Sequence, residues 1–76
     1  MITVKLFGLL RLESGIKERQ LEAATVKEVL QQLATEGISK KDLSGSVIFV
    51  NGEPANKRKK LIDGDLVVLM PPVAGG

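Results

Sequence analysis

The sequence predicts one α+β domain in which a single main helix packs on one face of a small sheet. Its 76 residues leave room for one hydrophobic core. Four segments have the alternating or continuously apolar character of strands, and one segment near the middle of the chain has helical spacing. The predicted order of elements is therefore β-β-α-β-β, with the helix crossing from a first hairpin to a later strand.

A β-hairpin with a long loop is predicted at the start of the chain. Residues 1–7 alternate in the way of a half-buried strand, with Ile2, Val4 and Leu6 on one face. Residues 9–15 have the composition of a turn region. Residues 16–23 alternate weakly, which indicates an edge strand that returns beside the first.

A helix is predicted to begin after Thr25. The spacing of Thr25 and Glu28 matches a capping box, in which the threonine hydroxyl accepts a hydrogen bond from a first-turn N–H and the glutamate reaches back. Gly37 is expected to end this helix in a left-handed conformation, and residues 38–45 to form a polar connection. The apolar residues that follow the cap at helical spacing form one stripe: Val26, Val29, Leu30 and Leu33.

Two further strands are predicted in the second half of the chain, and both are apolar on both faces. Residues 46–50 end at Asn51-Gly52, a strong turn dipeptide, and indicate a central strand. Residues 66–70 form another apolar run between the Asp63-Gly64-Asp65 turn and two prolines. Because one helix covers only one face of the sheet, we expect an apolar patch on the second face, which is typical of a docking surface.

Missing residue types exclude several classes of function. The chain has no Cys and no His, so it lacks the usual side chains of disulfide scaffolds, metal sites, thiol nucleophiles and serine–histidine relays. Phe7 and Phe49 are its only aromatic residues, which argues against binding of single-stranded nucleic acid by base stacking. No apolar run approaches the ~18 residues of a membrane span, and no signal peptide is recognisable, so we expect a cytoplasmic protein without a membrane partner.

Two groups of charged residues stand out in the sequence, a basic run and an acidic turn. The net charge of +2 arises from 11 basic and 9 acidic residues, and residues 57–60 alone carry four of the positive charges. Such a run usually lies in a solvated loop, and docking to an acidic partner is the alternative. Asp63 and Asp65 are better explained by turn formation than by acid–base catalysis, because nothing near them predicts a cleft.

The last six residues are unsuited to packing and suited to entering a channel. Pro71 and Pro72 fix an extended start. Side chains then shrink through Val73 and Ala74 to the terminal Gly75-Gly76, where only backbone remains. The functional group of such a tail would be the main-chain carboxylate of Gly76, although a frayed end is the commoner fate of a terminus.

Together with the element order, this tail makes the whole chain resemble the MoaD/ThiS family of ubiquitin-like sulfur carriers. Within that family the chain is most similar to the molybdopterin-synthase branch. The similarity lies in residues 4–7 with Arg11, in Val50-Asn51, in residues 63–65, and in the Pro71-Pro72-Val73 lead to Gly75-Gly76. The resemblance implies a ubiquitin-like β-grasp fold with a mixed sheet, formed by residues 1–70, followed by a flexible tail at residues 71–76.

The resemblance also implies a mechanism that needs no catalytic side chain from this chain. An E1-like activating enzyme would adenylate the Gly76 carboxylate with ATP, and a sulfur donor would displace AMP to give a thiocarboxylate. That sulfur would be donated in the large subunit of molybdopterin synthase, with this chain acting as the small subunit. No cofactor is expected on the chain itself, and ATP would be used by the activating partner.

Residues for partner docking follow from strand parity and from the resemblance. Phe7 has the parity opposite to Ile2, Val4 and Leu6, which favours a docking role. The residues expected to contact partners are Phe7, Arg11, Leu66, Val68 and Met70.

Other functions remain open at this point. One is a ubiquitin-like modifier whose Gly76 joins target lysines, and another is a sulfur carrier for a different pathway such as thiamine synthesis. A third is an interaction module with an inert tail, or a small nucleic-acid binder.

Overall fold

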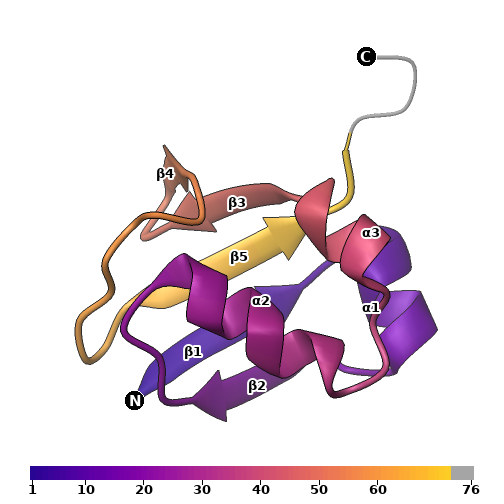
Figure 1. Ribbon diagram of the computed structural model, residues 1–76, viewed down its shortest axis with the longest axis horizontal. Coiled ribbons are helices and arrows are strands. Elements are labelled where there is room, and N and C mark those ends of the chain that lie inside the picture. Colours follow the sequence, from indigo (N-terminus) through magenta and orange to yellow (C-terminus); the bar gives the residue numbers. More distant parts are fainter. Residues whose placement is uncertain (73–76) are drawn as a thin grey trace.

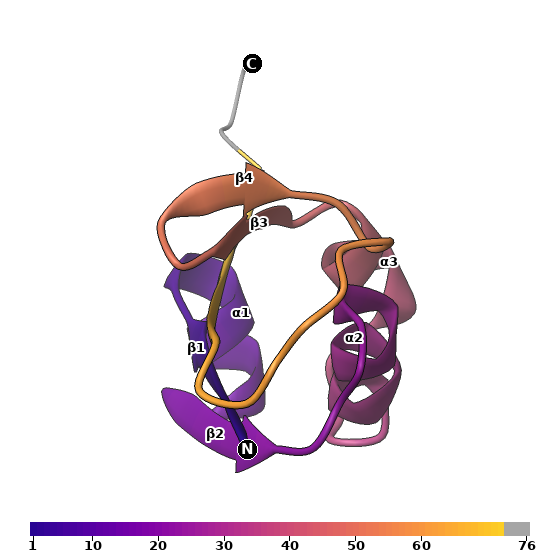
Figure 2. The ribbon, with the colours of Figure 1, turned by 90° about the vertical axis from the view of Figure 1, so that its left-hand side faces the viewer.

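A mixed five-stranded sheet with its longest helix on one face forms the body of the molecule (Figures 1 and 2). This computed structural model describes residues 1–72. Over those residues no helix combines the length and the apolar character needed to cross a membrane. The elements in chain order are β1 (Ile2–Leu6), α1 (Gly8–Ser14), β2 (Glu18–Leu21), α2 (Val26–Ala34), α3 (Lys40–Ser44), β3 (Val47–Val50), β4 (Glu53–Ala55) and β5 (Leu66–Met70).

The first and last strands pair at the centre of the sheet. The strand order is β2-β1-β5-β3-β4. β1 and β5 run parallel, whereas the β1–β2, β3–β5 and β3–β4 pairs are antiparallel. A parallel pair requires a crossover connection, which here contains α2. The predicted α+β class, mixed sheet and ubiquitin-like β-grasp topology are confirmed.

The core lies between α2 and one face of the central strands. Ile2, Val4 and Leu6 of β1 are buried, as are Val67 and Leu69 of β5. The parity assigned from the sequence to the first strand is therefore correct. Three residues of the predicted helical stripe, Val26, Val29 and Leu33, are completely buried against this face. The fourth, Leu30, is half-buried and packs at the margin of the core.

The predicted capping box opens α2. The Thr25 hydroxyl accepts a hydrogen bond from the Glu28 N–H at 3.3 Å. The Glu28 carboxylate reaches back to the Ala24 N–H, also at 3.3 Å, one residue earlier than in the usual pattern. Backbone carbonyls of the basic segment, residues 57–60, complete the cap. Lys57 O accepts a hydrogen bond from Lys27 N–H, and Lys59 O accepts one from Val26 N–H, both at 3.0 Å. The basic segment is thus fixed against the start of α2 through its backbone.

Two helices were missed by the sequence analysis. The predicted turn region at residues 9–15 is wrong, because α1 forms there with only Leu10 buried and with Gly15 as a left-handed C-cap. The predicted connection at residues 38–45 contains α3, which Ser39 caps by accepting from Asp42 N–H at 3.1 Å. Each helix buries a single side chain, so neither shows the repeated apolar spacing that identifies α2.

A fifth strand, β4, was also missed. Asn51 and Gly52 both have positive φ, 52° and 85°, as a tight hairpin turn requires, so the predicted turn is confirmed. The chain then returns along β3 as the three-residue edge strand β4. Pro54 lies within it, and proline in a strand is tolerated mainly at an edge. β4 was not predicted because it has only three residues, one of them a proline, and so shows no strand pattern in the sequence.

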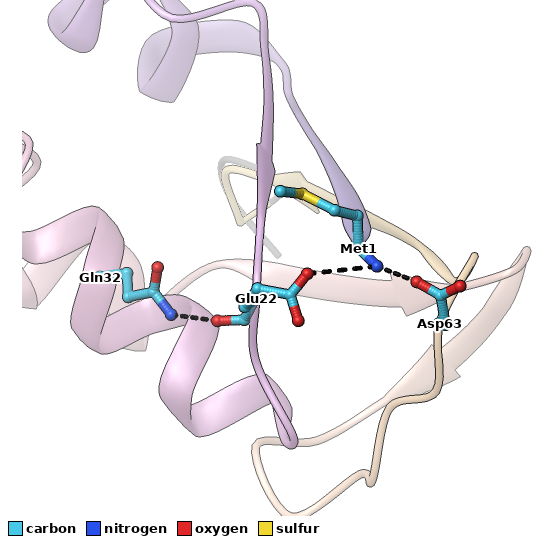
Figure 3. Close-up of polar contacts among 4 residues, drawn as sticks. All are labelled: Met1, Glu22, Gln32 and Asp63. Carbon is cyan, nitrogen blue, oxygen red and sulfur yellow. Dashed lines mark hydrogen bonds and ion pairs between the residues drawn. The ribbon is translucent and has the colours of Figure 1, made fainter.

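An exposed polar cluster joins the start of the chain to two turns (Figure 3). The amino group of Met1 contacts the Asp63 carboxylate, and it lies 3.3 Å from Glu22 Oε1. The Gln32 side-chain amide donates to the backbone carbonyl of Glu22 at 2.5 Å. These pairs are solvent-exposed and contribute little to stability.

Asp65 is the one buried charged residue among those described, and it organises the start of β5. Its carboxylate accepts hydrogen bonds from Ile62 N–H and from the Asn51 side-chain amide, both at 2.9 Å. Asn51 Oδ1 in turn accepts from Leu66 N–H at 2.9 Å. The Ile62 N–H first, and the Asn51 amide second, hold the pKa of Asp65 below its ordinary value, against the opposing effect of burial. Asp65 therefore stabilises the turn that precedes β5.

We expect Asp65→Asn to lower the thermal midpoint at neutral pH, with a difference from wild type that shrinks in acid. The folded-state pKa of Asp65 lies below its ordinary value of 3.8. Its stabilisation is therefore present above that value and is lost as pH falls through the folded pKa. Circular dichroism melts between pH 7 and pH 2 measure this, with Asp63→Asn as an exposed control. A constant difference at every pH would contradict the role of the ionised carboxylate.

Candidate functional site

The point where the tail leaves the sheet is defined by β1, β5 and the start of α1. β1 and β5 are parallel, so their carboxyl ends lie together, and Phe7 N–H donates to Leu69 O at 3.1 Å. Gly8 has φ +58°, and a Cβ placed on it would lie 2.8 Å from Pro71 Cγ and 3.0 Å from Pro71 Cδ. Only glycine fits both the backbone conformation and this contact. Gly8 thereby lets Pro71 pack closely and sets where the tail begins.

The reactive end predicted from the sequence lies outside the described residues. Those predictions concern Val73, Ala74, Gly75 and Gly76. Of the predicted tail, the structure describes Pro71, which is half-buried, and Pro72, which is exposed. The tail thus starts next to α1, at the opposite end of β5 from the Asn51–Asp65 hydrogen bonds (Figure 1).

A surface hollow of about 410 Å³ adjoins the start of the tail. Leu9 and Leu10 of α1, Asp42 of α3, and both prolines contribute to its wall. Beside it, Glu13 of α1 and Asp42 form a close carboxylate pair. A hydrogen bond to Asp42, then repulsion by its charge, then partial burial raise the pKa of Glu13 above its ordinary value. The hollow presents apolar surface to any protein that holds the tail.

The face of the sheet opposite α2 carries an apolar patch, which the burial pattern of β5 and its register with β3 define. Figure 2 shows α2 on the other side of the sheet. Leu66, Val68 and Met70 alternate with the buried Val67 and Leu69, and each is half-buried. The pairing register places Phe49 beside Val68 and Val47 beside Met70. We call this the open-face patch, and its members are Val47, Phe49, Pro54, Leu66, Val68 and Met70. The three predicted docking residues of β5 are therefore together on one face, and their role in docking remains a prediction.

Phe7 and Arg11 lie near the start of the tail. Phe7 follows the Leu6–Leu69 pair and keeps an extended backbone, which places it level with Met70 on the face of the patch. Its side chain is 43% exposed, which suits a docking residue. Arg11 lies one helical turn further along α1 and is exposed.

Val47, Phe49 and Pro54 are the patch residues that the sequence analysis did not assign. The strand at residues 46–50 is apolar on both faces, so its composition gave no indication of which side chains face the helices. That choice follows from the antiparallel register with β5, in which Phe49 is opposite Val68. The parity of β5 together with this register identifies Val47 and Phe49, and the register of β4 with β3 then identifies Pro54.

Solved structures with the same fold cover nearly the whole chain. SAMP1, a small archaeal modifier protein from Haloferax volcanii, is 25% identical with a TM-score of 0.82, over 99% of this chain and 98% of that chain. A putative molybdopterin converting factor subunit 1 from Pyrococcus furiosus is 26% identical with a TM-score of 0.80, over 95% and 97%.

A third structure contains a partner. It is a complex of subunits 1 and 2 of the molybdopterin-converting factor from Helicobacter pylori, and the matching chain is 29% identical with a TM-score of 0.75, over 99% of this chain and 97% of that chain. No curated protein matched the sequence. The profile of the ThiS family matches residues 4–76. The chain therefore belongs to the ThiS family, within the ubiquitin-like sulfur carriers and modifiers.

Proposed function

We propose that this chain carries sulfur as a thiocarboxylate on Gly76 and donates it during synthesis of molybdopterin. The observation that carries the proposal is the fixed start of a Gly-Gly tail, held by the Gly8–Pro71 contact beside an open apolar face. Two of the similar structures belong to molybdopterin-converting factors, which supports this pathway.

The reaction would proceed in two balanced steps on an activating enzyme. The Gly76 carboxylate attacks the α-phosphorus of ATP, forms an acyl adenylate and releases pyrophosphate. Sulfur supplied at the sulfide level, as hydrosulfide, then attacks the carbonyl carbon and becomes the thiocarboxylate sulfur, and AMP leaves with the electron pair of the broken C–O bond. Adenylation is needed because a carboxylate is a poor electrophile. The chain has neither Cys nor His, so the acid–base and sulfur-transfer groups are assigned to the partners.

The length and composition of the tail suit delivery into a second protein. Six residues, 71–76, extend at most about 20 Å from the end of β5. The small side chains at its end would pass a narrow entrance that a larger residue would block. The open-face patch and Phe7 would hold the domain while the tail enters the large subunit of molybdopterin synthase.

A protein-modifier role is the second candidate, because SAMP1 is among the most similar structures. The same activated Gly76 would then form an isopeptide bond with a lysine of a target. Intact mass spectrometry after incubation with an activating enzyme, ATP and a sulfur source separates the two functions. Replacement of oxygen by sulfur supports the carrier, and higher-mass conjugates support the modifier.

Adding one residue after Gly76 should abolish thiocarboxylate formation and leave folding intact. The extra residue moves the carboxylate by about 3.5 Å, more than a near-attack geometry tolerates. Deleting Gly76 should have the same effect. Mass spectra of wild type and both variants measure this outcome. A thiocarboxylate that forms efficiently on the extended chain, without trimming, would disprove the proposal.

Gly8→Ala should slow thiocarboxylate formation more than Gly15→Ala. Both positions have positive φ, so both variants pay a backbone cost, but a Cβ at Gly15 meets nothing within 4 Å whereas one at Gly8 overlaps Pro71. The difference between the two variants therefore isolates the displacement of the tail. Initial rates at a temperature where both variants are folded provide the comparison. Equal rates would show that the exit of the tail is unimportant.

Met70→Lys should weaken binding to the large synthase subunit by about 30-fold or more, the size expected at a hot spot. The substitution places a charge in the open-face patch, but Met70 is half-buried outside the core, so the fold should persist. Gln20→Lys, on an edge strand of the same face but outside the patch, is the matched control. Calorimetric titration measures both affinities. If the two variants bind equally well, the patch is not the docking surface.

A further inference from the structure

A second apolar surface lies on the helix side of the sheet, away from the open-face patch. It is a groove of about 390 Å³ between α2, α3, β3 and β4. Its apolar floor is formed by Leu30, Ala34, Leu43, Ile48 and Ala55. We call it the lysine-rimmed groove, because Lys27, Lys40 and Lys57 also line it.

The groove exists because α2 is too short and too central to cover the whole sheet. Its buried residues face β1 and β5, whereas β3 and β4 extend the sheet beyond it. Ile48 and Ala55 pair across these two outer strands, and both line the groove. Leu30 is half-buried for the same reason, although the helical stripe predicted it with the buried residues. The fold leaves this apolar floor uncovered among the described residues.

The charges at the groove are of one sign and are placed at both of its ends. The Lys27 N–H donates to Lys57 O at 3.0 Å, so these two residues lie at the same end. Ala34, seven residues after Lys27 on α2, lines the groove about 10 Å further along. That is the end at which α2 leads on toward α3, where Lys40 lies. No acidic residue lines the groove, and none of the three lysines has an ion-pair partner within residues 1–72.

Two of these lysines occupy positions that are unfavourable for their own helices. Lys27 lies in the first turn of α2, and Lys40 is the first residue of α3. A cation at a helix N-terminus opposes the helix dipole, where an acid would stabilise it. A residue type that is unfavourable for its own helix, and that makes no compensating contact within the domain, is expected where that residue takes part in binding.

We propose that the lysine-rimmed groove binds a short extended peptide segment of a partner protein, with apolar side chains in the floor and acidic side chains at both ends. Lysines at both ends of an apolar floor favour a segment in which at least one large aliphatic residue lies between two acidic residues. An anionic amphiphile with a single head group would satisfy only one end.

The inference goes beyond sulfur transfer, because the groove and the open-face patch lie on opposite sides of the sheet. A partner bound in the groove would leave the open-face patch accessible. The chain would then join two proteins, one that takes the tail and one that supplies the acidic segment.

Selection from a displayed library of random twelve-residue peptides tests the proposal. We expect enrichment of peptides in which acidic residues lie on both sides of Leu, Ile or Val. The best peptide should lose at least tenfold in affinity when Lys27, Lys40 and Lys57 are all changed to Glu. The control changes Lys17, Lys41 and Lys60 to Glu, which alters the net charge equally outside the groove. Glutamate at positions 27 and 40 agrees with the helix dipoles, so the groove variant should stay folded.

Amide NMR shifts with the selected peptide should map to α2, α3, β3 and β4. The proposal would be overturned by amide shifts confined to the open face or by equal losses of peptide affinity in both triple variants. It would also be overturned if the wild-type domain enriched no peptides beyond those that the groove variant enriches. Decanoate is titrated in parallel, and groove shifts with decanoate but with no peptide would overturn it too. Neither ATP nor an activating enzyme is present, so the result is independent of thiocarboxylate formation.

Discussion

The parallel pairing of β1 with β5 is the interaction on which the other features depend. It brings the first and last strands to the centre of the sheet, where Val4 and Val67 are completely buried. A parallel pair cannot be joined by a hairpin, so the chain must cross over the sheet, and α2 lies in that crossover. The same pairing puts the end of β5 beside Gly8. Core, crossover and tail position are therefore consequences of one register.

A small domain with one central helix has more apolar sheet surface than it can cover. α2 has nine residues and seals the face of β1 and β5. The opposite face of β5 and β3 remains half-exposed, and so does the helix side of β3 and β4. Exposed apolar area of this kind is costly unless a partner covers it. The two surfaces we assign to binding are thus the two places that the helix does not reach.

The sequence predicted the elements with repeated burial and missed the two helices that bury one residue each. β1, β5 and α2 bury several side chains at fixed spacing, and Thr25 marked the start of the helix. α1 and α3 depend on Leu10 and Leu43 alone. The start of the tail was predictable from Pro71 and Pro72, and half of the open-face patch was predictable from strand parity. The contribution of Phe49 depends on the strand register, which is a long-range property. The close approach of Gly8 to Pro71 is likewise a contact between distant segments.

The strongest local constraints in the described chain act on β5. Asn51, with positive φ, and the buried Asp65 fix its start. At its other end the Phe7 N–H donates a hydrogen bond to Leu69 O, and Pro71 packs closely against Gly8. A strand held at both ends gives the tail a defined origin, so less conformational freedom is lost when a partner draws it in. This suits the proposed function, in which the reactive atom belongs to the backbone and the side chains would position that atom and bind the partners.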